Sequence, residues 1–308
     1  MVTDSSLEPI LQRVPQFAHA RNLTLAELTG GITNRNYKVV ADGETYVLRI
    51  GGDETKYLGI DRRVEYGCTL AASRVGVAPE PIAFLEPEGY LVTRFISGPG
   101  IPADQVGTEA NIRRVVELLK RYHALDHFPG AFSPFRVAEA YERTARSFSV
   151  QLPEKMAWYL EKAHEIERAM YRAPFTPRPC HNDLLNANFI DEGARIRILD
   201  WEYAGMGDLF FDLGNFAVQH EFDAGQDDFL LRAYFGDAML SQVEGRSHRA
   251  RLKLMKIMSD LREAMWGVVQ VGASKLDFDY KGYAQKYFDR FEAAAKSEKY
   301  ADWLKDAK

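Results

Sequence analysis

Cysteine is scarce in this chain, which has only Cys68 and Cys180 among its 308 residues. Two cysteines cannot form a disulfide framework and no CxxC spacing occurs, which favours a reducing compartment. No run of about 18 apolar residues is present, so no membrane span is expected. The first residues contain neither a basic cluster nor an apolar stretch, so no secretory signal is expected. These absences together predict a cytoplasmic protein.

Basic charge is also in short supply, with 39 Lys and Arg against 44 Asp and Glu and a formal net charge of -5. A nucleic-acid-binding protein needs a basic face, so nucleic acid is not an expected partner. The hydrophobic fraction of 46% and the charged fraction of 27% are ordinary for a globular protein with a sizeable core. The length favours two lobes rather than one small domain.

Strand and hairpin signals dominate the first hundred residues. A first helix is expected around residues 10–17, where apolar residues are periodic. Apolar runs on both sides of an Asp-Gly pair predict a hairpin over residues 37–50. A helix over residues 61–75, with Val64, Leu70 and Ala71 buried, and a second hairpin over residues 82–96 complete this part.

Helical periodicity prevails after the Gly- and Pro-rich segment 97–102, which is the strongest linker in the chain. Two helices show a core-facing stripe of apolar residues. The stripe residues are Ile112, Val115, Val116, Leu119 and Tyr122 in one helix, and Leu254, Met258, Leu261, Met265 and Val268 in the other. The predicted fold is therefore α+β and two-lobed, with a small antiparallel β lobe (1–97) that binds nucleotide and a larger, mainly helical lobe (98–308) for catalysis and substrate binding.

The most specific motif reads H-x-D-x-x-x-x-N over residues 181–188, with Asp200 behind a short apolar run. This is the spacing of a kinase catalytic loop. Asp183 can orient an attacking hydroxyl, and Asn188 and Asp200 supply the oxygen ligands that Mg²⁺ prefers. Each residue alone could equally cap a turn, but their order and spacing together favour phosphoryl transfer. We expect His181 to be a hydrogen-bonding support rather than a base.

A kinase also needs a loop that covers the phosphates. Gly30, Gly31, Thr33 and Asn34 lie directly before the first hairpin, where glycines let backbone N–H groups approach phosphates. A Gly-Gly pair is by itself only a turn signal, so this assignment depends on the rest of the pattern.

A cation on the following strand and an acid on the following helix complete the nucleotide site of a kinase. Arg49 lies between apolar neighbours on that strand, an unfavourable place for a charge that has no partner. Glu65 is the best-placed acid, with Asp61 as second choice. The alternative is that these residues form a surface pair of little energetic weight.

These motifs resemble the choline/ethanolamine kinase family, within the aminoglycoside phosphotransferase group of small-molecule kinases. The matching segments are 30–34, 48–49, 180–188, 200–203, 211–215 and 265–270, within residues 28–290. The resemblance implies a kinase-like fold and the cofactors ATP and Mg²⁺. It also implies that Asp183, Asn188 and Asp200 are the base and magnesium ligands, and that Thr93 and Phe95 belong to the hinge that contacts adenine.

The acceptor is expected to be a small molecule. Only twelve positions separate Asp200 from Asp212 and no Ala-Pro-Glu triplet follows, whereas protein kinases use a longer segment to dock a polypeptide. We expect Asp212 to brace the catalytic loop.

A second stripe on the predicted helix around residues 252–273 suggests a wall for a cationic substrate. Trp266 offers the best ring for a cation–π contact, and Glu263 lies one turn before it. By resemblance Tyr283 is a further aromatic of the cation box, and Glu202 is placed with the substrate. The alternative is that these aromatic residues simply belong to the core.

The favoured acceptor is the hydroxyl of a small cationic amino alcohol, choline or ethanolamine. Glu263 stands where better-known choline kinases carry a second Trp, so the choice among cations stays open. An aminoglycoside, thiamine or a sugar are the alternatives within the same group, and a nucleotide-binding pseudokinase is the alternative from another class. A homodimer also stays open.

Overall fold

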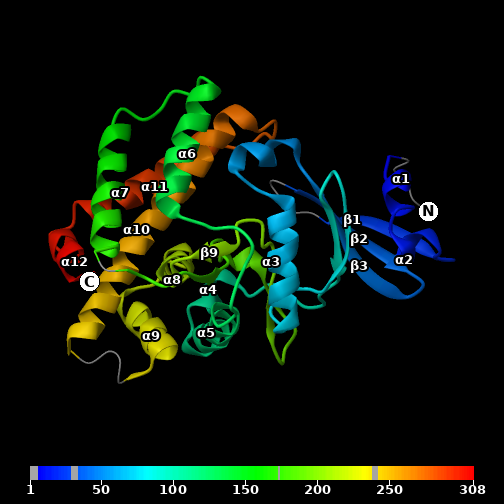
Figure 1. The fold of residues 1–308 in the computed structure, drawn as a ribbon, viewed down its shortest axis with the longest axis horizontal. Helices are drawn as coiled ribbons and strands as arrows, with labels where there is room; N and C mark the ends of the chain where they lie inside the picture. Colours follow the sequence, from blue (N-terminus) through cyan, green and yellow to red (C-terminus); the bar gives the residue numbers. More distant parts are fainter. Residues whose placement is uncertain (1–5, 29–33, 173, 238–241) are drawn as a thin grey trace.

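The computed structural model describes residues 6–28, 34–172, 174–237 and 242–308. Its N-terminal part is a five-stranded antiparallel sheet in the order β1-β2-β3-β5-β4, with α3 (Arg62–Arg74) between the sheet and the helical part (Figure 1). The strands are β1 (Leu23–Leu28), β2 (Asn34–Ala41), β3 (Glu44–Gly51), β4 (Pro81–Leu85) and β5 (Tyr90–Arg94).

The two predicted hairpins are confirmed. In the first, Val39 and Leu48 are fully buried, in keeping with the alternation of apolar and polar residues along each strand. Asp42 and Gly43 connect the two strands with φ angles of 48° and 92°. Positive φ at both positions is the requirement of a type I′ hairpin turn, for which Asp-Gly is a preferred pair.

The prediction for the first thirty residues was incomplete. The expected single helix is two short ones, α1 (Glu8–Leu11) and α2 (Pro15–Ala18), because Pro15 begins a new helix after the extended residue Val14. Strand β1 was not predicted. It pairs antiparallel with β2 along its whole length.

The predicted helix over residues 61–75 is α3, and Asp61 caps it by accepting hydrogen bonds from two backbone N–H groups. The face that it buries differs from the prediction. Its buried residues are Glu65, Cys68, Thr69 and Ala72, whereas Val64, Leu70 and Ala71 are half-buried. The buried face contains Glu65, whose carboxylate forms an ion pair with Arg49 of strand β3.

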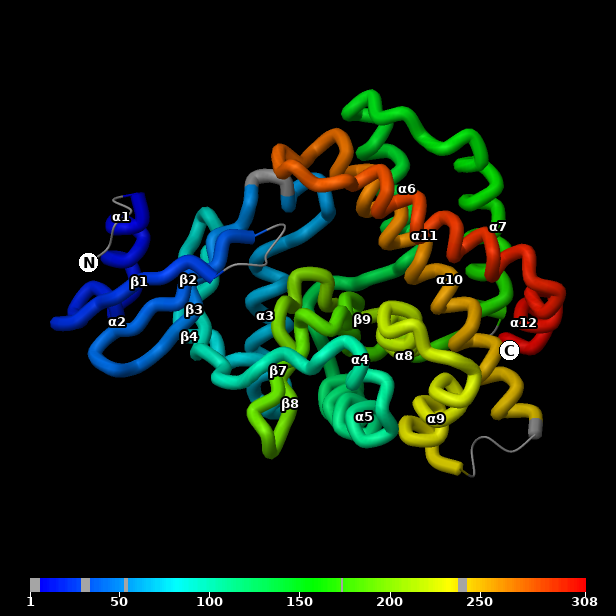
Figure 2. Tube along the Cα trace, turned by 180° about the vertical axis from the view of Figure 1, so that it is seen from behind, coloured from blue at the N-terminus to red at the C-terminus, as the bar shows by residue number. Residues whose placement is uncertain are grey.

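Residues after the linker are mainly helical, as predicted, and all residues of the two predicted apolar stripes are buried. The longest helix, α10 (Gln242–Ala273), contacts α6 (Pro134–Ser147), α8 (Leu209–Gln219), α11 (Tyr280–Ala295) and α12 (Tyr300–Asp306), and α11 runs alongside it (Figure 2). The further helices are η1 (Asp53–Leu58), α4 (Ala103–Val106), α5 (Glu109–His123), α7 (Met156–Met170), η2 (Asn186–Asn188) and α9 (Ala224–Phe235). Among the helices that the structure describes, none has both the length and the apolar character needed to cross a bilayer.

Two short antiparallel pairs hold the segment that carries the kinase-like motif. Strand β6 (Arg178–Cys180) pairs with β9 (Gly205–Gly207), and β7 (Phe189–Asp191) pairs with β8 (Ile196–Ile198). The motif residues 181–188 therefore form a loop between β6 and β7, and Asp200 follows β8.

Candidate active site

Asp212, in the first turn of α8, holds the backbone of the motif loop. It is fully buried and accepts hydrogen bonds from the backbone N–H groups of His181 at 2.9 Å and Asn182 at 2.6 Å. The Tyr122 hydroxyl donates to the same carboxylate at 2.6 Å, and His123 Nε2 lies 3.0 Å from it. The predicted bracing role of Asp212 is therefore confirmed.

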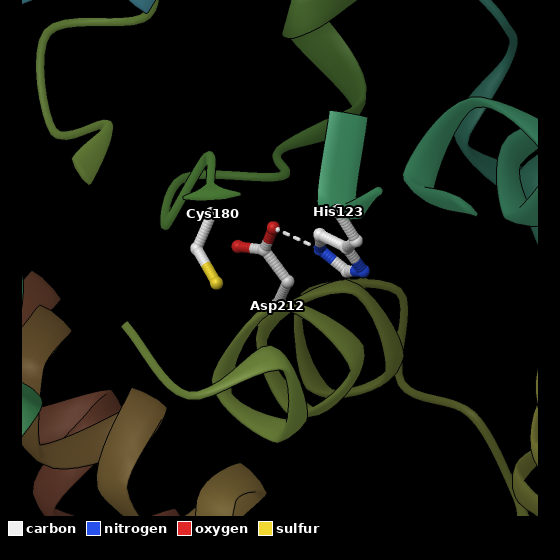
Figure 3. Close-up of side chains that lie close together, drawn as sticks. All are labelled: His123, Cys180 and Asp212. Carbon is white, nitrogen blue, oxygen red and sulfur yellow. Dashed lines mark hydrogen bonds and ion pairs between the residues drawn. The ribbon is translucent and has the colours of Figure 1, made fainter. Parts of the chain in front are cut away.

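Asp212 also lies close to His123 and Cys180, and these three side chains are of types that can bind a metal ion (Figure 3). Burial raises the pKa of the Cys180 thiol well above its usual value, which keeps the proton on sulfur. Burial also raises the pKa of Asp212, but its hydrogen bonds to His123 and Tyr122 outweigh this and lower the pKa overall. The Asp212 oxygens are occupied by these donors, so the cluster is a hydrogen-bond hub.

His181 links the two segments that carry the candidate catalytic residues. Its Nε2 lies 2.8 Å from the Leu199 carbonyl, and its Nδ1 accepts from the Asp183 N–H at 3.2 Å. Burial lowers the pKa of His181, so the ring is neutral at pH 7 and can donate from one nitrogen while accepting at the other. The expected supporting role of His181 is confirmed.

Hydrogen bonds to backbone carbonyls bring Asp183, Asn188 and Asp200 close to one another. The Asn188 side-chain amide donates to the Asp183 carbonyl at 2.8 Å, which leaves the Asn188 Oδ1 atom as its remaining ligand atom. The Leu199 N–H donates to the Asn188 carbonyl at 2.8 Å, which places Asp200 beside Asn188. Asp200 has a φ of 59°, a conformation that costs energy for a residue with a side chain and is concentrated at functional sites.

The charge of this region fits a bound cation. Burial, together with the nearby Glu202, raises the pKa of Asp200 well above its usual value, although Arg49 opposes this. Burial likewise raises the pKa of Asp183 to about 6, against the effect of Arg262. Carboxylates crowded in this way would be stabilised by a divalent cation, and Asn188 and Asp200 offer the oxygen donors that Mg²⁺ prefers.

The side chain of Arg49 extends from strand β3 of the sheet to Asp200. It forms an ion pair with Glu65 of α3, and its Nη1 lies 3.3 Å from Asp200 Oδ1. Asp61, the second choice for the acid, caps the helix instead. Burial lowers the pKa of Arg49, but Glu65 and Asp200 more than compensate, so the guanidinium keeps its charge.

Arg62 was missed by the sequence analysis. Its guanidinium bonds to Glu65 at 2.7 Å, Glu202 at 3.0 Å and the Asn34 Oδ1 atom at 2.7 Å. Asn34 also donates to Glu202 at 3.0 Å. Glu202, which the sequence analysis placed with the substrate, is therefore engaged by Arg62 and Asn34 in this structure. The spacing of three residues between Arg62 and Glu65 on a helix was the available signal.

The remaining nucleotide-site predictions fall on two segments. Gly30, Gly31 and Thr33 lie outside the described residues. Thr93 is on β5 with 9% of its surface exposed, and the Phe95 N–H donates to the Thr45 carbonyl at 3.1 Å.

The predicted acceptor residues lie on α10 and α11. Glu263 accepts a hydrogen bond from the Tyr283 hydroxyl at 2.7 Å, and the Trp266 and Tyr283 rings meet edge to face with centroids 5.4 Å apart. Glu263 and Trp266 are buried, at 2% and 8% exposed. Arg262, a second residue missed by the sequence analysis, pairs with Glu263 and also with Asp183 at 3.1 Å.

The two aromatic residues beside Asp200 differ in whether their rings can contact a cation. Trp201 is a core residue, 1% exposed, which packs against Tyr122 and His181 and donates to the Ile198 carbonyl. The Trp201 ring is therefore part of the core and does not face a substrate. Tyr203 does present its ring to a cation, but this cation is Arg262, at 4.2 Å from the ring centroid.

Comparison with known proteins matches residues 24–248 to the phosphotransferase enzyme family APH. A solved choline/ethanolamine kinase family protein from Mesorhizobium loti is 30% identical, with a TM-score of 0.80 over 97% of each chain. Ethanolamine kinase 1 from Mus musculus is 25% identical over 88% of this chain and 84% of its own length. Protein LicA from Haemophilus influenzae is 25% identical over 84% of this chain and 77% of its own length.

These matches confirm the two-lobed, kinase-like α+β fold and the resemblance seen in the motifs. The chain belongs to the phosphotransferase enzyme family, and within it this small-molecule kinase is a member of the choline/ethanolamine kinase family.

Proposed function

We propose that this protein is an ATP- and Mg²⁺-dependent kinase that phosphorylates the hydroxyl of a small amino alcohol, ethanolamine or choline. The observation that carries the proposal is the contact between the Asn188 amide and the Asp183 backbone, with Asp200 beside them. This arrangement supports a role for the Asp183 carboxylate in orienting the hydroxyl and roles for Asn188 and Asp200 as metal ligands. We also propose that the protein is located in the cytoplasm.

We propose a different role for each of the two lobes. Residues 1–97 form the nucleotide-binding lobe, where Arg49, held by Glu65, neutralises phosphate charge and Thr93 and Phe95 border the adenine. We further propose that Gly30, Gly31, Thr33 and Asn34, of which the first three lie outside the described residues, contact the phosphates. Residues 98–308 form the lobe for catalysis and acceptor binding.

In the proposed mechanism Asp183 accepts a hydrogen bond from the acceptor hydroxyl and orients it for in-line attack. Asn188 Oδ1 and the Asp200 carboxylate would hold Mg²⁺, which when bound neutralises charge on the phosphates. His181 and Asp212 keep the loop in this conformation through their hydrogen bonds.

Acceptor recognition would use the cluster of Glu263, Trp266 and Tyr283. Aromatic rings and a carboxylate are the groups that hold a cationic ammonium. The names of the similar proteins, ethanolamine kinase 1 and a choline/ethanolamine kinase family protein, support this class of acceptor.

The test is an ADP-release assay with choline, ethanolamine, dimethylaminoethanol, thiamine and an aminoglycoside. We expect turnover with an amino alcohol that stops on chelation of Mg²⁺ with EDTA and returns when Mg²⁺ is added. Turnover with thiamine or the aminoglycoside alone would move the acceptor to another class, and no turnover with any acceptor would contradict the proposed activity.

A further inference from the structure

The side chain of Arg262 lies between two carboxylates. It is 2% exposed, and its Nη1 atom donates to Asp183 Oδ1 at 3.1 Å and also pairs with Glu263 Oε1. Nη1 carries two N–H bonds, so this single atom can serve both carboxylates. The centroid of the Tyr203 ring lies 4.2 Å from the guanidinium carbon. These three neighbours together hold the guanidinium beside Asp183.

Both oxygens of Glu263 are engaged by the protein itself. Oε1 pairs with Arg262, and Oε2 accepts a hydrogen bond from the Tyr283 hydroxyl at 2.7 Å. Glu263 is buried, and the positive charge of Arg262 compensates its negative charge. An ammonium group would have to displace part of this buried pair to reach the carboxylate. The rings of Trp266 and Tyr283 are therefore better suited to receive the cation of an acceptor.

The two oxygens of the Asp183 carboxylate differ. Oδ1 accepts the hydrogen bond from Arg262, whereas Oδ2 receives none within the described part of the chain. The side chain is 12% exposed, so the carboxylate is not sealed off. A carboxylate that is held at one oxygen can no longer rotate freely, and it keeps the lone pairs of the other oxygen for a hydroxyl.

We propose that Arg262 is a positioning residue for phosphoryl transfer, which holds Asp183 at Oδ1 and leaves Oδ2 for the acceptor hydroxyl. Glu263 anchors Arg262 and acts on the reaction through it, so the cation-binding part of the acceptor cluster narrows to Trp266 and Tyr283. The inference rests on the proposed function, in which Asp183 orients the reacting hydroxyl. It separates two kinds of variant: loss of the positioning pair lowers kcat, whereas loss of a ring raises KM for the acceptor.

The first test is Glu263→Gln, which keeps the size of the side chain and an oxygen for Arg262 but removes the charge. Steady-state ADP release with ethanolamine and with choline gives kcat and KM. We expect kcat to fall about fivefold to tenfold, because Arg262 is held less firmly, and KM for the acceptor to change less than about threefold. A rise of this KM by about tenfold or more would show that the carboxylate binds the cation. That rise, or an unchanged kcat, would overturn the proposal.

Trp266→Leu is the comparison for the first test. It removes a ring and leaves the ion pair between Arg262 and Glu263 in place, so KM for the acceptor should rise about tenfold with a smaller change in kcat. The opposite patterns of Trp266→Leu and Glu263→Gln support the proposal. A shared pattern, with KM raised in both, would overturn it.

The second test alters Arg262 itself. Arg262→Leu leaves Asp183 without its donor, so kcat should fall about 100-fold while KM for ATP and for the acceptor changes less than about threefold. Arg262→Lys should recover kcat to within about tenfold of wild type, because one nitrogen makes both contacts and a lysine ammonium has donors enough for them. Arg249→Leu, which breaks a partly exposed pair with Asp228 on the same helix, is the matched control and should keep kcat within about twofold.

The outcomes of the second test are distinct. An equal loss of kcat in folded Arg262→Lys and Arg262→Leu would overturn the proposal, and so would a kcat that stays constant or rises in Arg262→Leu. Circular dichroism checks folding, and if Arg262→Leu does not fold, Glu263→Gln decides. Failure of the wild-type protein to use any amino alcohol would instead count against the proposed function.

Discussion

The side-chain amide of Asn188 donates a hydrogen bond to the main-chain carbonyl of Asp183 across 2.8 Å. This contact uses one of the two N–H donors of the amide and leaves its oxygen for a cation. The residue proposed to orient the hydroxyl and a residue proposed to hold the metal are therefore parts of one small unit. A substitution of one of these two residues should therefore also affect the position of the other.

Asn188→Ala removes both the hydrogen bond and the oxygen ligand. We expect kcat to fall at least 100-fold, and the Mg²⁺ concentration for half-maximal rate to rise, whereas stability should change by only about 1 kcal/mol. Asn111→Ala, which removes a similar side-chain-to-carbonyl hydrogen bond on α5, is the control and should leave the Mg²⁺ dependence unchanged. An unchanged Mg²⁺ dependence in Asn188→Ala would contradict its role as a ligand.

Asp183→Ala should abolish turnover and leave nucleotide binding largely intact. In the proposed mechanism the Asp183 carboxylate orients the acceptor hydroxyl, and a positioned acid or base contributes roughly 10²–10⁴-fold to rate. ADP release measures the turnover, and titration with a fluorescent nucleotide measures the binding. Turnover within tenfold of wild type would refute the role of Asp183.

Arg49→Met should raise KM for ATP at least tenfold, because the cation between Glu65 and Asp200 would be lost. The matched control is Arg63→Met on α3. Arg63 pairs with Glu86 and 77% of its side chain is exposed, so its loss should change KM for ATP less than twofold. Equal effects of the two substitutions would show that Arg49 acts only through general charge.

Asp212→Asn should destabilise the protein by about 3 kcal/mol or more, because buried hydrogen bonds to a charged group are lost and an amide group faces backbone N–H donors. Activity should fall along with stability, since the motif loop loses its brace. Urea unfolding measures the change. Asp302→Asn, at an exposed position of α12, is the comparison and should alter stability by less than about 0.5 kcal/mol.

Asp260 gives a pH-dependent contribution to stability. Burial raises its pKa to about 7, against the effect of Arg290, whose Nη2 lies 3.1 Å away. The folded protein therefore binds this proton more tightly than the unfolded chain, so stability is present at low pH and is lost as pH rises towards 7. Between pH 5 and pH 8 the wild type should lose roughly 3 kcal/mol more unfolding free energy than Asp260→Asn.

The pH comparison is made by urea unfolding of both proteins in the same buffers. Asp289→Asn, on the exposed side of α11, controls for general loss of an acid and should follow the wild type. Parallel pH profiles of Asp260→Asn and wild type would contradict the raised pKa.

Local patterns allowed much of the fold to be predicted. The hairpins were predictable because alternation of burial and an Asp-Gly turn are properties of neighbouring residues. The split at Pro15 and the existence of β1 were not foreseen, since β1 has an exposed edge and only a half-buried pattern, which gives a weak periodic signal. The buried face of α3 was missed because the attraction between Glu65 and Arg49 overrides the apolar periodicity.

The motif of Asp183, Asn188 and Asp200 could be read directly from the chain, because one loop and one short strand pair set their separation and local backbone bonds bring them together. Arg62 and Arg262 could not, since Arg62 meets Glu202 across 140 positions and Arg262 meets Asp183 across 79. Such contacts depend on how α3 and α10 pack against the motif loop. Short-range spacing thus determines the motif, whereas the long-range packing of the helices decides which charged side chains surround it.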